Sequence, residues 1–252
     1  MSAISLTKLA TLALATLSTV TALPATTLSA RQDTPCSTVH IFLAKGFNEP
    51  YPGRQGALAG SICYGLPSCT YEDILFSNAN TTSFNYCTST FEGTSNGIAQ
   101  MTAYAARCPD AQLVLSGYSQ GANVAGDMLG GGGGVFGDGD DACTMATTAG
   151  LDITKSPGNK IAAATLFGDT EHVANQPYNV LSGAGISSAA PRSATSLAKM
   201  NQFAGVLRSY CVAGDPICAA TGPGPFDIQD HLSYFDVYTQ EAAEWVKWML
   251  EN

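Results

Sequence analysis

The sequence predicts an α/β fold in which a parallel sheet is covered by helices on both faces. Short apolar runs typical of buried strands alternate along the chain with segments whose apolar residues recur at helical spacing. The chain has 252 residues, of which 45% are hydrophobic and only 12% charged, so it can bury a sizeable core and does not have a disordered composition. No internal repeat or linker rich in proline or serine interrupts residues 32–252, which we therefore expect to form one domain.

The first half of the domain supplies three expected strands and two expected helices. In order, these are a strand over 38–44, a short helix over 54–61, a strand over 71–76, a helix over 94–107 and a strand over 112–116. The loop after the first strand contains two prolines and two glycines. The longer helix has Ile98, Met101 and Ala105 on one face, and Thr94 or Ser95 can cap it. The polar stretch 78–90 before it is rich in turn-forming residues.

The second half continues the alternation of strands and helices. The expected elements are a helix over 122–129, an acidic excursion over 137–159, strands over 161–167 and 206–212, and a final helix over 234–250. Five consecutive glycines, Gly130–Gly134, follow the first of these helices, so they indicate a helix stop and not a phosphate-binding loop. In the final helix Ala242, Ala243 and Val246 share a face, and Trp245 and Trp248 are expected to pack rather than to bind carbohydrate.

Residues 1–22 have the pattern of a cleaved secretory signal peptide. Lys8 is the one charge ahead of an apolar stretch over 9–20 that ends in small residues. This stretch is shorter than the roughly 20 apolar residues that a membrane-spanning helix needs. Residues 23–31 are expected to be either a propeptide removed after Arg31 or a disordered terminus.

Charge and cysteine content narrow the class of partner. Lys and Arg number 11 and Asp and Glu 20, so the formal net charge is −9. This charge leaves no basic face for a nucleic-acid backbone or for an anionic membrane. Eight cysteines are more than a cytosolic enzyme usually contains and indicate an oxidising compartment. The composition therefore predicts a secreted globular protein that binds neither nucleic acid nor membranes.

A nucleophile elbow is predicted at Ser119. The pattern Gly117-x-Ser119-x-Gly121 follows directly on an expected strand and precedes an expected helix, which is the context that gives the pattern its meaning. The glycines leave room for a strained turn and for close approach of strand and helix. The helix beginning near Gln120 points backbone N–H groups toward the oxyanion of a tetrahedral intermediate.

A serine nucleophile needs a general base, and the chain has three histidines. His40 lies in the first strand, upstream of the elbow, where a structural role is expected. In α/β hydrolases the acid follows the serine and the histidine comes last. That order selects His231, in the loop before the last helix, and leaves His172 as the second candidate.

The acid that orients the base must lie between the nucleophile and His231. Asp215 follows an expected strand within Cys211-Val-Ala-Gly-Asp-Pro-Ile-Cys218, and a bridge between the two cysteines would close a small loop around it and restrict its motion. Asp169 also follows a strand, but a turn or capping role is expected there. Asp227 and Asp230 lie too near His231 in sequence to serve as well.

The motif around Ser119, the Cys-x-x-x-Asp-Pro-x-Cys motif and the late histidine together resemble one family. They are similar to those of the cutinases and acetylxylan esterases (carbohydrate esterase family 5-like enzymes), which are secreted, mostly fungal serine esterases, and the likeness covers roughly 36–250. The resemblance implies a three-layer α/β-hydrolase fold with a central five-stranded parallel sheet and no lid. It also implies that Ser119 is the nucleophile, His231 the base and Asp215 the orienting acid.

The resemblance also exposes a departure at the oxyanion hole. In this family a small hydroxyl residue after the first strand supplies a backbone N–H and a side-chain donor, and here Phe47 stands at that position. The N–H of Phe47 can still serve beside that of Gln120, but the side-chain donor is missing unless Asn48 replaces it. The spans 137–159 and 178–199 are longer than a minimal cutinase needs and are expected to wall the site.

The family's two recurrent disulfide bonds are implied at Cys36–Cys108 and Cys211–Cys218. The other four cysteines allow three pairings, between which the sequence does not choose: Cys63, Cys69, Cys87 and Cys143. Asn80 starts the sequon Asn80-Thr81-Thr82 and is a glycosylation candidate in a polar loop.

These observations predict a secreted serine carboxylester hydrolase that cleaves plant cell-wall esters. Its polar composition and long loops favour acetyl or other short-chain esters, as on acetylated xylan, and the alternative is cutin or longer fatty acyl esters. A remote alternative is a non-catalytic wall- or surface-binding protein, which only the change at Phe47 supports. We expect a monomer with no cofactor and no metal.

Overall fold

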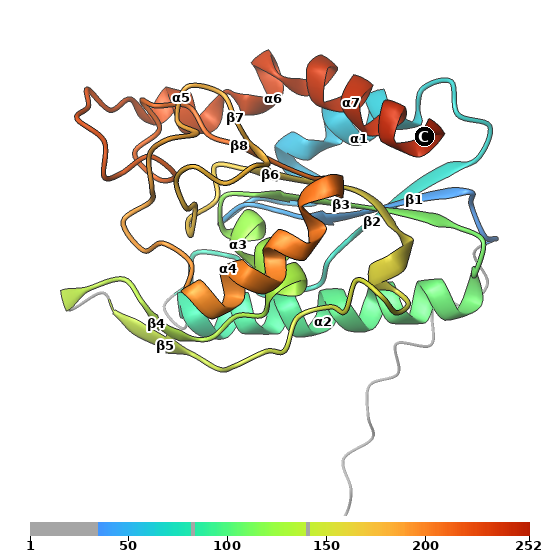
Figure 1. The fold of residues 1–252 in the computed structure, drawn as a ribbon, viewed down its shortest axis with the longest axis horizontal. Helices are drawn as coiled ribbons and strands as arrows, with labels where there is room; N and C mark the ends of the chain where they lie inside the picture. Colours follow the sequence, from blue (N-terminus) through green and yellow to red (C-terminus); the bar gives the residue numbers. More distant parts are fainter. Residues whose placement is uncertain (1–34, 82–83, 140–141) are drawn as a thin grey trace, which may run out of the picture. The chain divides into compact units, whose positions relative to one another are not determined.

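The computed structural model describes residues 35–81, 84–139 and 142–252. The predicted signal peptide, residues 1–22, and the expected propeptide or terminus, residues 23–31, lie outside the described residues. One compact unit extends over Cys36–Asn252. The α/β class predicted from the sequence is confirmed (Figure 1).

Six parallel strands form the central sheet, in the order β2-β1-β3-β6-β8-β7. Their bounds are β1 (Val39–Ala44), β2 (Cys69–Asp73), β3 (Gln112–Tyr118), β6 (Ile161–Phe167), β7 (Asn179–Val180) and β8 (Leu207–Tyr210). The expectation of five strands is wrong because of β7, a two-residue strand that pairs with Ser209 and Tyr210 at the sheet edge. Two residues make no apolar run, so the sequence pattern does not show this strand.

Helices cover both faces of the sheet (Figure 1). They are α1 (Gly56–Cys63), α2 (Tyr86–Arg107), α3 (Gln120–Gly130), α4 (Ala194–Met200), α5 (Ile228–Leu232), α6 (Tyr234–Val237) and α7 (Thr239–Glu251). Among the described residues, 3₁₀ segments lie before α1 (Gly53–Gln55), before β6 (Gly158–Lys160) and between α4 and β8 (Asn201–Val206). A separate antiparallel hairpin pairs β4 (Gly134–Phe136) with β5 (Cys143–Met145). Strand β5 lies inside the excursion expected over 137–159, whereas β4 comes just before it.

The alternation of side chains along β1 divides the core into two clusters. Phe42 packs with the apolar residues of α2, α3 and α4, whereas Ile41 and Leu43 pack with those of α1 and α7. Every residue of β1 is buried, because a parallel sheet with helices on both faces leaves neither side of its central strands to solvent. This double burial explains why β1 and β3 appear in the sequence as continuous apolar runs.

Helix α2 begins earlier than predicted, at Tyr86 rather than near Thr94 or Ser95. Asn85 caps it, since its side-chain oxygen accepts the N–H of Thr88 at 2.9 Å. Residues 86–90 of α2 belong to the stretch 78–90, which the sequence predicts to be rich in turns. Further along α2, small residues allow α3 to approach closely: a Cβ atom on Gly97 would lie 2.5 Å from the sulfur of Met128.

The C-terminal helix also differs from its prediction in two ways. It is divided at Tyr238 into α6 and α7. Trp245 packs against the core as expected, but Trp248 is 58% exposed, so the packing prediction is wrong for Trp248. Across the described residues, no helix has the length and apolar character needed to cross a membrane.

All eight cysteines form disulfide bonds. Cys36–Cys108 and Cys211–Cys218 pair as the family resemblance implies. The two pairings that the sequence left open are Cys63–Cys69, which joins the end of α1 to the start of β2, and Cys87–Cys143, which joins α2 to strand β5 of the hairpin. Asn80, the glycosylation candidate, is exposed, and its backbone N–H donates to the side-chain oxygen of Asn48. Thr82 of its sequon lies outside the described residues.

Candidate active site

Ser119 occupies a strained turn between β3 and α3. Its backbone has φ 55° and ψ −122°, a conformation that residues other than glycine rarely adopt and that costs on the order of 1–3 kcal/mol. The Ser119 N–H donates to the carbonyl of Phe167 on the adjacent strand β6 at 2.8 Å, which holds the turn in place. The elbow predicted from the sequence is therefore present, with Ser119 beyond the carboxyl end of a central strand.

The two glycines of the motif are required by packing, not by flexibility. A Cβ atom on Gly117 would lie 2.3 Å from the carbonyl oxygen of Gly121, across the turn. A Cβ atom on Gly121 would lie 1.9 Å from the carbonyl oxygen of Ala44 at the end of β1. Both contacts are to backbone atoms, which cannot rotate away as a side chain can.

We expect Gly121→Ala to destroy the elbow. The methyl group has no space between α3 and the end of β1, so the protein should be recovered mostly insoluble or with an unfolding midpoint many degrees below that of the wild type. Gly60→Ala is the matched control, because Gly60 lies in an exposed position of α1 with nothing within 4 Å of an added Cβ. That control should be neutral or stabilising by up to about 1 kcal/mol. Equal thermal midpoints for the two variants would contradict this account of the motif.

Ser119, His231 and Asp215 are joined by hydrogen bonds. The hydroxyl oxygen of Ser119 lies 2.9 Å from Nε2 of His231, and Nδ1 of His231 lies 2.9 Å from Oδ2 of Asp215. A carboxylate only accepts hydrogen bonds, so the proton of the neutral imidazole is on Nδ1. Nε2 is then the free acceptor, and the Ser119 hydroxyl donates to it.

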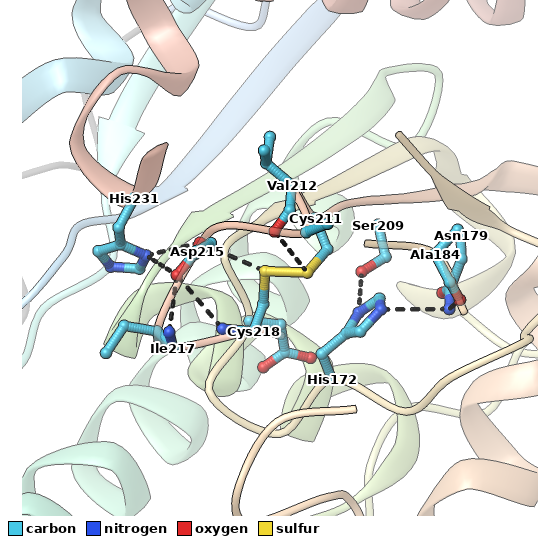
Figure 2. The surroundings of a disulfide bond; sticks show 12 residues. His172, Asn179, Ala184, Ser209, Cys211, Val212, Asp215, Ile217, Cys218 and His231 are labelled. Atoms are coloured by element: carbon cyan, nitrogen blue, oxygen red, sulfur yellow. Dashed lines mark hydrogen bonds and ion pairs between the residues drawn. A yellow bond between two sulfur atoms is a disulfide. The ribbon is translucent and has the colours of Figure 1, made fainter. Parts of the chain in front are cut away.

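Asp215 is fully buried and is held by several donors (Figure 2). Its Oδ1 accepts the backbone N–H of Ile217 at 2.7 Å, and its Oδ2 accepts the hydroxyl of Tyr234 at 2.7 Å. Burial opposes ionisation, but the hydrogen bond and charge of His231, with these two donors, outweigh it and bring the pKa of Asp215 below its ordinary value. The Cys211–Cys218 bridge closes the turn around this carboxylate.

His231 lies on the short helix α5, and not in a loop as predicted. Asp227 caps this helix by accepting the N–H of Gln229 at 2.9 Å. The hydroxyl of Tyr118, next to the nucleophile, donates to the His231 carbonyl at 3.0 Å. Gly168 packs directly against the imidazole, since a Cβ atom on it would lie 2.8 Å from Cε1.

The other candidate bases and acids are engaged elsewhere. His172 is buried, with Nδ1 3.1 Å from the hydroxyl of Ser209 and Nε2 3.3 Å from the side-chain amide of Asn179, as Figure 2 shows. Burial lowers the pKa of His172. His40 is stacked on Tyr104 with ring centroids 3.8 Å apart, as expected of a structural histidine. Asp169 belongs to an ion-pair cluster around Arg192.

Two backbone N–H groups are available as oxyanion donors. In the described part of the chain, neither the N–H of Gln120 nor that of Phe47 has a hydrogen-bond acceptor. The side chain of Gln120 is committed to Ser89, to which it donates at 2.9 Å. The Phe47 ring packs on Phe84 at 4.8 Å between centroids, and Oδ1 of Asn48 accepts from the backbone N–H of Asn80.

Three residues that hold this site in place were not predicted from the sequence. Tyr234 donates to the acid from a position one helical turn after the base, a spacing that could have suggested it. Gly168 and Tyr118 lie beside His231 through tertiary packing alone. Within residues 35–81, 84–139 and 142–252, no group of three or more His, Cys, Asp or Glu side chains is placed to hold a metal ion.

The parallel sheet, the strained elbow and the hydrogen-bonded serine, histidine and aspartate are those of an α/β hydrolase. More narrowly, the chain belongs to the cutinase family, since that family's model matches residues 35–250. Relatives named acetylxylan esterase, cutinase and carboxylesterase place it among the serine ester hydrolases.

Two curated relatives illustrate the range of the family. The chain is 28% identical to an acetylxylan esterase of Hypocrea jecorina over 223 residues, which cover 86% of this chain and 68% of that protein. It is 29% identical to Cutinase 11 of Verticillium dahliae over 222 residues, covering 86% of this chain and 70% of that protein.

Solved structures give the same result. The catalytic core domain of an acetyl xylan esterase from Trichoderma reesei superposes with a TM-score of 0.72 at 27% identity, over 85% of this chain and all of that one. A cutinase-like protein from Cryptococcus sp. has a TM-score of 0.60 at 19% identity, over 85% of this chain and 93% of that one, and this likeness concerns the fold alone.

Proposed function

We propose that this protein hydrolyses esters with Ser119 as nucleophile, His231 as general base and Asp215 as orienting acid. The observation that carries the proposal is the continuous line of hydrogen bonds from the Ser119 hydroxyl through His231 to Asp215. In the first step the Ser119 oxygen attacks the ester carbonyl carbon while its proton passes to Nε2 of His231. The imidazolium that forms faces the buried carboxylate, which stabilises its charge.

The acyl group is then transferred in two halves. His231 gives its Nε2 proton to the leaving alkoxide, so the alcohol departs and an ester of Ser119 remains. A water molecule loses a proton to the same nitrogen and attacks that ester, and the returning proton releases Ser119 and the carboxylic acid. The tetrahedral oxyanion of each half is stabilised by the backbone N–H of Gln120, at the amino end of α3, and by that of Phe47, in the loop after β1.

Acetyl esters on xylan are the proposed substrates. Acetylxylan esterases recur among the relatives, and three solved acetyl xylan esterase structures superpose with TM-scores of 0.70–0.72 at 26–27% identity. The structures of a cutinase-like protein and of a cutinase superpose with TM-scores of 0.60 and 0.58 at 19% and 20% identity. The low charged fraction of 12% also suits binding of a neutral sugar polymer.

Longer fatty acyl esters, as in cutin, are the second candidate. Three large apolar side chains from segments adjoining the site are exposed: Phe47 by 40%, Phe226 by 45% and Ile228 by 48%. Phe47 follows β1 beside the elbow, and the other two flank the start of the helix that carries His231. An apolar rim of this kind would favour a long acyl chain.

Rates on esters of different chain length separate the two candidates. We expect kcat/KM for p-nitrophenyl acetate to exceed that for p-nitrophenyl palmitate by at least about tenfold, and acetate to be released from acetylated xylan faster than fatty acids from cutin. Ser119→Ala run in parallel removes the contribution of spontaneous hydrolysis. Equal or faster turnover of the palmitate would overturn the acetyl assignment and establish the cutin reading.

We also infer that the mature protein is secreted and acts as a monomer on ester substrates. The paired cysteines support an oxidising compartment, and the N-terminal sequence supports export. The net charge of −9 opposes a nucleic-acid partner. The alternative of a non-catalytic binding protein rested only on the change of side chain at Phe47. The backbone N–H of Phe47 has no acceptor among the described residues and can still donate to an oxyanion, so we do not favour that alternative.

A further inference from the structure

Arg192 forms a buried ion cluster that the ester-hydrolysis mechanism does not use. Its guanidinium contacts Asp127 of α3, lies 3.0 Å from Glu171 and lies 3.6 Å from Asp169. The side chains of Arg192, Asp127 and Asp169 are at most 2% exposed, and that of Glu171 is 17% exposed. We call these four residues the Arg192 cluster.

The Arg192 cluster fastens the segment 168–172 to the helix that follows the nucleophile. Asp127 lies on α3, whereas Asp169 and Glu171 lie just after β6. The guanidinium rests on Gly126 of α3, where a Cβ atom would lie 2.3 Å from Nη2. A second link runs beside it, because the Tyr86 hydroxyl lies 2.8 Å from that of Thr170 and 3.1 Å from the side-chain oxygen of Asn123 on α3.

This segment is also the support of the general base. Gly168, at its start, packs on the imidazole of His231 and has φ +58°, so any side chain there would be strained and would displace the ring. Asp169 is the next residue. A shift of the fastened segment by a fraction of an ångström would therefore move His231 relative to the Ser119 hydroxyl.

The charges of the cluster do not balance. Three carboxylates face a single guanidinium, so full ionisation would leave two uncompensated negative charges in a buried space. Oδ2 of Asp127 is buried and accepts no hydrogen bond among the described residues. A proton held by Glu171, whose side chain is within hydrogen-bonding reach of the Asp127 carboxylate, would remove one of the two charges.

We propose that Arg192 is a positioning residue for His231, acting through the Arg192 cluster, and that the cluster works with Glu171 in its neutral form. The proposal rests on the proposed esterase function, because the geometry that it preserves is that of Ser119 and His231. Arg192 itself touches neither the substrate nor the reacting atoms.

The electrostatics of the cluster agree with its geometry. Burial, with the negative charges of Asp127 and Asp169, raises the pKa of Glu171 to about 8 against the opposing effect of Arg192. The charged and titratable groups that interact with it are Arg192, Asp127 of α3, Asp169 and, from α2, Tyr86, and the side chains of His172 and Tyr178 line the same cavity. Burial raises the pKa of Asp127 as well.

The raised pKa of Glu171 makes the stability of the fold depend on pH. Unfolded Glu171 loses its proton near its ordinary pKa of 4.5, whereas folded Glu171 keeps it until about pH 8. The folded state thus binds more protons than the unfolded state between these values, so the contribution of Glu171 to stability is complete below about pH 4.5 and declines as pH rises to about 8. Above that pH the decline stops, and the cluster carries its full repulsion.

Glu171→Gln is the first test, because glutamine preserves the shape and neutrality of the protonated side chain. At pH 7 its kcat on p-nitrophenyl acetate should lie within about twofold of wild type, and between pH 8 and 10 the wild type should lose about threefold or more relative to the variant. Its unfolding midpoint should rise relative to wild type between pH 5 and 8 and then stay parallel. Glu241→Gln, in the exposed pair of Glu241 with Arg208, is the control that should track wild type.

Arg192→Lys is the second test, because lysine keeps the charge but cannot bridge three carboxylates with a planar fork. With active sites counted by phosphonate titration, kcat at pH 7 should fall about tenfold while KM stays within about twofold. Arg208→Lys is the matched control in the exposed pair and should leave kcat unchanged. If Arg192→Lys does not fold, the Glu171→Gln profiles still decide the proposal.

Failure of this inference is distinguishable from failure of the proposed function. Activity remaining in Ser119→Ala would overturn the proposed function. If Ser119→Ala is inactive, the inference alone is overturned by superimposable pH profiles of wild type and Glu171→Gln, by a loss of more than about twofold in Glu171→Gln at pH 7, or by wild-type kcat in folded Arg192→Lys.

Discussion

Ser119→Ala is expected to lower kcat for p-nitrophenyl acetate by about 10⁴- to 10⁶-fold while leaving the fold intact. Alanine has no hydroxyl to donate to Nε2 of His231 or to attack the ester, so no acyl-enzyme can form. The backbone constraint on the turn is unchanged, because the N–H of residue 119 still donates to Phe167. Activity is measured by release of p-nitrophenol and folding by circular dichroism and the thermal midpoint.

Ser95→Ala on α2, away from the elbow, is the control and should keep wild-type turnover. A Ser119→Ala protein that retains more than about a tenth of the wild-type rate would show that this serine is not the nucleophile, whatever its geometry.

Asp215→Asn is expected to lower kcat by about 10³- to 10⁴-fold. The N–H of Ile217 fixes an oxygen at the Oδ1 position, which leaves the amide NH₂ at the Oδ2 position facing Nδ1 of His231. Nδ1 must then accept, so the imidazole proton moves to Nε2 and the Ser119 hydroxyl loses its acceptor. The same NH₂ also faces the Tyr234 hydroxyl, which can no longer donate there.

Steady-state kinetics against Asp236→Asn test this prediction, since Asp236 is an exposed acid on the neighbouring helix α6. The control should match wild type. A folded Asp215→Asn protein within about tenfold of the wild-type kcat would mean that Asp215 does not set the tautomer of His231.

The pKa of Asp215 lies below its ordinary value of 3.8, so its ionisation stabilises the fold above that pH. This stabilisation is lost only as the pH falls through the lower pKa of the folded state.

The elbow and its partners could be predicted because each has a local sequence mark. The glycines around Ser119 follow an apolar strand, Asp215 lies between two closely spaced cysteines, and His231 is the last histidine of the chain. Strand ends in a parallel sheet converge on one edge, so residues at those ends meet even when they are far apart in sequence.

Elements without such a mark were missed. Strand β7 pairs over two residues in a polar segment, so nothing in its composition indicates a strand. The first half of α2 contains several Ser and Thr residues and a Gly, which have low helix propensity when considered alone, and α3 packs closely against α2 at Gly93 and Gly97. In both cases tertiary contact outweighs local preference.

The Arg192 cluster could not be predicted from the sequence for a different reason. Asp127, Asp169 and Arg192 come from three separate segments, and each looks in its own context like an ordinary surface charge. Only the packing of α3 against the segment after β6 buries them together. Burial is what turns these charges into a constraint on the general base.

Covalent labelling tests the central claim, that Ser119 is a nucleophile activated by His231 and Asp215, most directly. The wild-type protein is treated with a fluorophosphonate, digested and analysed by mass spectrometry, beside Ser119→Ala and His231→Ala. The account predicts one phosphonate per molecule on the peptide that contains Ser119, loss of esterase activity in proportion, and no labelling of either variant on the same timescale. A wild-type protein that stays unlabelled, or that is labelled at another residue while losing activity, would contradict it.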